Sequence, residues 1–112
     1  MSKNYMIAIL KTPNKPPKII KLPKRLKDMQ KIVGGIIEEK RYEKILIIYN
    51  ENQKDSKLKT NNIFIDLSVR GTILITGNDE KNGDIRSLSK REVVKYMRKI
   101  IYKDKDIQNE IE

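Results

Sequence analysis

The apolar residues of this chain come in short runs, and this spacing restricts the fold more than any other feature of the sequence. Each run has the length of a β-strand, and turn-forming Pro, Gly or Asn residues stand between many of them. Runs of this kind are typical of strands joined by turns. We therefore expect strands in residues 5–11, 18–22, 36–39, 44–50, 71–76 and 84–88, with a short apolar segment in residues 63–65.

Two of the connections indicate hairpins. Residues 12–17 (TPNKPP) contain three prolines, so they favour an extended or turning connection, and residues 18–22 are expected to form the return arm. Asn82-Gly83 is a favoured tight-turn dipeptide, so residues 84–88 are expected to pair back onto the preceding strand. The run KILIIYN (44–50) is continuous enough for a strand that is buried on both faces.

The pattern changes to helical spacing in the segment that follows residue 22. Pro23 suits the first turn of a helix, where its missing N–H costs nothing. Leu26, Met29 and Val33 then recur on one face, and Gly34 is a natural C-terminal stop. We predict a short amphipathic helix. Its opposite face carries three lysines, Lys24, Lys27 and Lys31.

A second helix is expected at the C-terminal end of the chain. Ser89 and Glu92 form a capping box, in which each side chain satisfies a free backbone N–H of the helix start. An apolar face follows at helical spacing. Its residues are Val93, Val94, Met97, Ile100 and Ile101. Another face is basic. Its residues are Arg91, Lys95 and Arg98.

These elements predict an α+β fold: a small, mostly antiparallel sheet packed by two helices, one central and one C-terminal. The 112 residues are an ordinary length for one domain. The apolar pattern ends after Tyr102. We therefore assign residues 1–102 to a single α+β domain and residues 103–112 to a frayed C-terminal tail.

The composition excludes several classes of function. The chain has no histidine and no cysteine, so the Ser-His-Asp and Cys-His triads and the imidazole and thiolate metal sites cannot be built. We expect no enzyme activity, no metal and no cofactor. No apolar run approaches the roughly 20 residues that span a bilayer, and no signal-peptide pattern opens the chain. We expect a cytoplasmic protein without a membrane partner.

The positive charge of the chain is concentrated in its first 31 residues. Nine basic residues and one acid lie there, in a chain whose net charge is +10. Such a surface repels itself unless it faces an anion, so it indicates an anionic partner. The alternative is a solvated face in a lysine-rich protein. We predict an anion-binding site with six members: Lys18, Lys21, Lys24, Arg25, Lys27 and Lys31. Arg91, Lys95 and Arg98 form a secondary basic face.

Two stretches resemble a known family, the domain-of-unknown-function 3846 family. The first is LKDMQKIVGGIIE (residues 26–38), and the second is GTILITGNDEKNGDIRSL (residues 71–88). The resemblance covers roughly residues 5–101. It implies a small α+β domain encoded by phages and other mobile elements of bacteria, often near anti-restriction or other accessory genes, with no established activity. The lysine-rich opening departs from the family pattern, and so does the stretch LKTNN (residues 58–62).

Charge and resemblance together predict a non-catalytic accessory protein of a phage or mobile element. We expect an anti-defence factor in the cytoplasm of the bacterial host, which binds or sequesters a nucleotide signal, a nucleic acid or an acidic host protein. The alternative is a DNA-binding accessory or regulatory protein of a mobile element. The small core and exposed strand edges are compatible with a homodimer, which would double any basic face.

Overall fold

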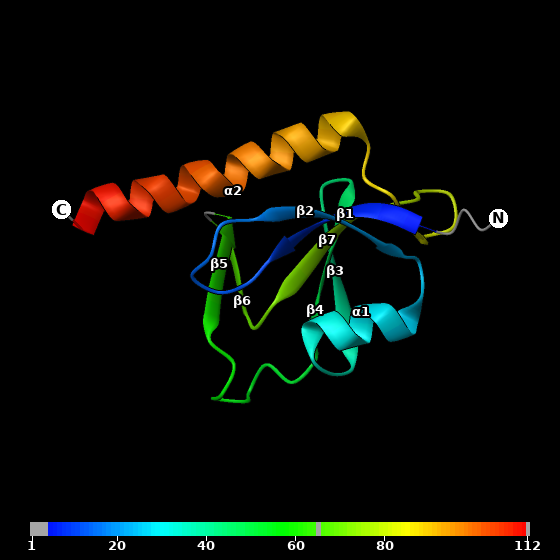
Figure 1. Ribbon diagram of the computed structural model, residues 1–112, viewed down its shortest axis with the longest axis horizontal. Coiled ribbons are helices and arrows are strands. Elements are labelled where there is room, and N and C mark those ends of the chain that lie inside the picture. The colour runs from blue at the N-terminus through cyan, green and yellow to red at the C-terminus, as the bar shows by residue number, and fades with distance from the viewer. Residues whose placement is uncertain (1–4, 65, 112) are drawn as a thin grey trace.

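The structure, a computed structural model, describes residues 5–64 and 66–111, and side chains as far as Ile100. A twisted sheet lies at its centre, with helix α1 on one face and helix α2 on the other (Figure 1). A two-stranded hairpin, β5–β6, lies beside α2. The predicted α+β architecture, with one central and one C-terminal helix, is confirmed.

Most element bounds lie close to the predicted runs, but the hairpin β5–β6 was expected only as a short apolar segment, and β8 is shorter than expected. The strands are β1 (Tyr5–Lys11), β2 (Lys18–Pro23), β3 (Ile37–Tyr42), β4 (Ile45–Asn50), β5 (Thr60–Phe64), β6 (Leu67–Arg70), β7 (Ile73–Asn78) and β8 (Ile85–Arg86). The helices are α1 (Leu26–Val33) and α2 (Lys90–Ile111).

The main sheet has the order β2-β1-β7-β4-β3, and β8 pairs with the end of β7. All of its pairings are antiparallel. The two predicted hairpins form as expected: β1 pairs with β2, and β8 pairs back onto β7 after the Asn82-Gly83 turn. Strands β2 and β3 are therefore the outer edges of the sheet.

Strand β4 separates the two halves of the core. Ile45 and Ile47 lie in the cluster under α2, whereas Leu46 and Ile48 lie in the cluster under α1. All four side chains are at most 5% exposed. The prediction of a strand buried on both faces is confirmed. Each such side chain contributes roughly 1.5–3 kcal/mol of hydrophobic stabilisation.

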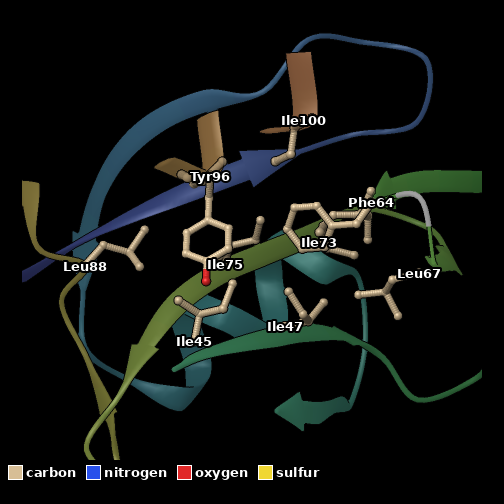
Figure 2. Packing of buried hydrophobic residues seen from close by; sticks show 11 residues of the cluster. Ile45, Ile47, Phe64, Leu67, Ile73, Ile75, Leu88, Tyr96 and Ile100 are labelled. Atoms are coloured by element: carbon tan, nitrogen blue, oxygen red, sulfur yellow. The ribbon is translucent and has the colours of Figure 1, made fainter. Parts of the chain in front are cut away.

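The α2 face of the sheet holds the larger cluster. Figure 2 shows Tyr96 and Ile100 reaching from α2 toward Ile73 and Ile75 of β7, with Phe64 of the hairpin beside them. The Phe64 ring lies 5.8 Å from the Tyr96 ring, centroid to centroid. Of the predicted apolar face, Val93, Met97 and Ile100 pack α2 against the sheet, but Val94 is 58% exposed and the buried Tyr96 was not predicted.

Helix α1 covers the other face with Met29 and Val33, which are both buried. It ends at Gly34, which adopts a left-handed conformation with φ of 82°, as the sequence predicted. The expected position of Pro23 is wrong. Pro23 is the last residue of β2 and pairs with Tyr5, and the helix begins after Arg25. An edge strand tolerates proline, because one of its sides needs no N–H.

The start of α2 has the predicted capping box. The Glu92 N–H donates to Ser89 Oγ (3.1 Å), and the Ser89 N–H donates to Glu92 Oε1 (2.9 Å). The helix continues to Ile111, beyond Tyr102, where the sequence pattern ends. The division into a domain of residues 1–102 and a frayed tail of residues 103–112 stays a prediction.

Candidate anion-binding surface

The structure places all six predicted N-terminal cations at the surface. Lys18 and Lys21 belong to β2, and Lys27 and Lys31 belong to α1. Lys24 and Arg25 lie in the connection between the two elements, so Lys24 precedes the helix instead of lying on it. The six are Lys18, Lys21, Lys24, Arg25, Lys27 and Lys31, and each is exposed.

The sheet divides this set between two faces. Side chains alternate along a strand, so residues three apart point to opposite sides. Lys18 shares a face with Leu22, which is buried under α1. Lys21 lies opposite Ile7 on the other face, with its ammonium 5.4 Å from the Tyr5 ring centroid. Lys21 is therefore not part of one continuous surface with α1.

We define the α1 surface as the five remaining cations: Lys18, Lys24, Arg25, Lys27 and Lys31. Its one acid is Asp28, and Arg25 Nε donates to Asp28 Oδ2 over 2.9 Å. Elsewhere on this surface, no carboxylate of the described residues lies within 4 Å of the ammonium groups of Lys24, Lys27 or Lys31. Their charges are left to counterions or to an anionic partner.

A further lysine of the basic N-terminal segment turns inward. Lys11 is only 2% exposed, and its ammonium donates to the Thr12 carbonyl (3.1 Å) and to Asn61 Oδ1 (3.3 Å). Asn61, which is fully buried, donates in turn to the carbonyls of Lys11 (2.8 Å) and Gly71 (2.9 Å). Lys11 thus fixes β5 to β1 and cannot take part in binding.

The residues of the predicted secondary basic face lie on α2, and one of them, Lys95, forms an ion pair with Glu43 over 3.2 Å. Arg91, Lys95 and Arg98 are all exposed and, with Lys90, line a shallow, open depression around Val94. Val94 itself is 58% exposed. The acid of this part of α2, Glu92, is turned away from the depression and bonds to Arg86. We call these four cations the α2 surface.

A network of polar and aromatic side chains holds α2 against the turn between β3 and β4. Glu43, at a φ of 56°, accepts hydrogen bonds from the Tyr96 hydroxyl and from Lys95 Nζ (3.2 Å). Lys99 Nζ donates to the Tyr42 hydroxyl (3.0 Å), which donates to Asp66 (3.2 Å). The sequence gives no signal for this network, because Glu43 and Tyr96 are far apart along the chain.

Each pKa shift in this network moves the pKa of the group further from pH 7. The hydrogen bonds from Tyr96 and then Lys95 lower the pKa of Glu43. Burial, followed by the hydrogen bond to Glu43, raises the pKa of Tyr96. The hydrogen bond to Tyr42 raises the pKa of Lys99. All three groups therefore keep one protonation state at neutral pH, which suits a structural role better than proton transfer.

A mixed-charge depression lies at the end of the sheet. Its lining residues are Lys44, Asn78, Asp79, Glu80, Lys81 and Arg86. Arg86 forms a two-pronged ion pair with Glu92, with both N···O distances 2.8 Å. Across the side chains that the structure describes, those of residues 5–64 and 66–100, no three acidic groups gather in a way that could hold a metal ion.

Comparison with known proteins places the chain in a family. The model of the domain of unknown function DUF3846 matches residues 6–101, which include every strand except the first residue of β1. The chain belongs to the DUF3846 family. No curated protein and no solved structure shows a significant match to it. Within the part of the DUF3846 chain that the structure describes, neither helix has the length and apolar content needed to cross a bilayer.

Proposed function

We propose that this DUF3846 protein is a non-catalytic accessory protein of a phage or mobile element that binds an anionic partner through the α1 surface. The observation that carries the proposal is the unpaired charge of Lys24, Lys27 and Lys31, which lie together next to and along α1. Ammonium groups without carboxylate neighbours bind phosphates or carboxylates with release of counterions. The anti-defence role and the bacterial cytoplasm follow from the family resemblance.

The absence of a tuned acid or base supports the non-catalytic part of the proposal. General acid–base catalysis needs a group whose pKa lies near the working pH. In the described residues, the shifted carboxyl groups move the other way: the pKa of Glu43 is lowered, and that of Glu92 is lowered to about 2 by the hydrogen bond from Arg86. The chain also has no histidine or cysteine.

Charge reversal on the α1 surface tests the proposal. The variant Lys24→Glu/Lys27→Glu/Lys31→Glu should lose binding of fluorescent polyglutamate and of a single-stranded oligonucleotide by more than tenfold at low salt. The matched control reverses three exposed lysines on other segments, Lys40→Glu/Lys57→Glu/Lys81→Glu, and has the same net charge. Equal losses in both variants would show that net charge, not the α1 surface, binds these probes.

A second function, DNA binding through α2, is favoured by one observation: the α2 surface gathers four cations around one depression, although one of them, Lys95, also pairs with Glu43. Neutralising about four phosphates gives a slope near −3.6 for log K against log salt on duplex DNA. Arg91→Glu/Arg98→Glu should weaken duplex binding strongly and flatten this slope. A duplex that binds this variant as tightly as the unaltered protein would refute the DNA-binding function.

A further inference from the structure

Among residues 5–64 and 66–111, no strand pairs with the outer edge of β2, and the hydrogen-bonding groups of this edge can be assigned from its partner strand β1. The Ile7 N–H donates to Ser87 Oγ (2.8 Å), and the Ile7 carbonyl accepts from the Leu88 N–H (2.9 Å). Both backbone groups of Ile7 therefore point away from β2. Residues opposite each other in an antiparallel pair alternate between bonded and non-bonded pairs, so Ile7 and Lys21 form a non-bonded pair.

The same alternation fixes the direction of every backbone group in β2. Lys18, Ile20 and Leu22 bond inward to β1, whereas Ile19, Lys21 and Pro23 point their backbone groups outward. Pro23 has no N–H, and its carbonyl already accepts from the Arg25 N–H (2.9 Å). The outer edge of β2 thus offers two N–H donors and two carbonyl acceptors, those of Ile19 and Lys21. Pro17 and Pro23, which have no N–H, bound this short window of pairing groups on either side.

The side chains beside this window select the charge of any added strand. Exposed charged residues from 15 to 27 are all basic. They are Lys15, Lys18, Lys21, Lys24, Arg25 and Lys27. A second copy of β2 would bring the same lysines to the edge and be repelled. An acidic strand would be attracted, and Ile19, 53% exposed, gives it an apolar side chain to cover.

We infer that the outer edge of β2 binds an extended acidic segment of a partner protein as an added strand. Main-chain hydrogen bonds to Ile19 and Lys21 supply the affinity, as in other cases of strand addition, and the lysines supply the selectivity. Lysine at an edge also blocks indiscriminate pairing, and both effects favour an acidic strand over a neutral or basic one. This inference rests on the proposed function, because it names the class of anionic partner.

The test separates backbone pairing from charge. The probe is a fluorescent peptide of alternating Glu and Val, compared with the same peptide N-methylated at all of its internal amides, so that neither edge of the peptide can donate to β2. N-methylation removes strand donors and leaves the charge unchanged, so it should weaken binding about fivefold to tenfold. Ile19→Pro removes one outward N–H without touching the β1 ladder and should weaken binding similarly. Ile19→Val keeps both the N–H and an apolar side chain, so it should bind the plain peptide clearly more tightly than Ile19→Pro does.

Each outcome decides between the two proposals. Equal binding of the plain and methylated peptides by the unaltered protein would overturn strand addition, even if Ile19→Pro failed to fold. If polyglutamate still bound in that case, the α1 surface would retain its proposed function. If neither peptide nor polyglutamate bound while an oligonucleotide did, strand addition would be overturned and a nucleic acid would be the partner. Slower amide hydrogen exchange at Ile19 and Lys21 on adding the plain peptide would support strand addition.

Discussion

Replacing Glu92 by glutamine should remove one of the strongest charge interactions of the molecule. The Glu92 carboxylate accepts two hydrogen bonds from the Arg86 guanidinium, both over 2.8 Å, and a third from the Ser89 N–H. Only 16% of the Glu92 side chain is exposed, so water screens these bonds weakly. The change to glutamine keeps the size and one acceptor oxygen but removes the charge.

The pKa of Glu92 gives the size of the stability loss expected for Glu92→Gln and the direction in which this loss changes with pH. The Arg86 hydrogen bond lowers this pKa from 4.5 to about 2. At 1.36 kcal/mol per unit, the shift corresponds to roughly 3 kcal/mol of folding stability. Because the folded pKa lies below the unfolded one, this contribution is complete above about pH 5 and is lost as the pH falls toward 2. Near pH 7, Glu92→Gln should therefore melt roughly 10 °C lower.

The predicted loss of stability can be checked by urea unfolding. The unaltered protein and Glu92→Gln are compared at intervals from pH 7 to pH 2. The difference in unfolding free energy should be largest at pH 7 and approach zero at pH 2. The lowered pKa of Glu43 affects both proteins alike and cancels in the difference. A difference below about 1 kcal/mol at pH 7, or one independent of pH, would show that the ion pair does not stabilise the fold as argued.

A substitution in strand β7 should disturb the same ion pair between Arg86 and Glu92. A Cβ on Gly77 would lie 2.2 Å from Arg86 Nη1, so Gly77→Ala must displace the guanidinium from Glu92. If the two changes break one interaction, the combined variant Gly77→Ala/Glu92→Gln should lose clearly less stability than the single variants together. Additive losses would place the cost of Gly77→Ala elsewhere in the sheet.

Three further changes have defined outcomes. Gly34→Ala should cost about 1 kcal/mol in urea unfolding, since a Cβ there meets no atom within 4 Å but the φ of 82° is strained for alanine. Asn61→Leu should cost roughly 3 kcal/mol in the same assay, because the buried amide bonds Lys11 and two carbonyls. Tyr96→Phe should remove one high-pH step from an absorbance titration of the tyrosines, because burial and Glu43 raise the Tyr96 pKa.

The elements of the fold were predictable where local chemistry decides them. The capping box of Ser89 and Glu92 and the left-handed Gly34 are set by residues within a turn of each other, and both are present. Pro23 was misassigned because a proline fits both the first turn of a helix and the edge of a sheet. The residues next to Pro23 in the sequence do not distinguish a helix start from a strand end. In the structure Pro23 pairs with Tyr5, so it belongs to the strand.

The composition of the surface was less predictable than the fold. Lys11 belongs to the basic segment but is buried against Asn61, a partner fifty residues away that no local pattern announces. The separation of Lys18 and Lys21 could have been predicted, because residues three apart in a strand face opposite ways. The network of Glu43 and Tyr96 depends on α2 crossing the β3–β4 turn, and so on tertiary structure alone.

The placement of the two basic surfaces gives a way to decide which of them binds. The sheet separates them, because α1 packs on one of its faces and α2 on the other. One short rigid anion cannot contact both, so charge reversals on the two helices should act independently on its binding. If Lys24→Glu/Lys27→Glu/Lys31→Glu abolishes binding of a short probe and Arg91→Glu/Arg98→Glu leaves it unchanged, the α1 surface is the site. Comparable losses of the short probe from both variants would show that net charge, and not one of the two surfaces, governs its binding.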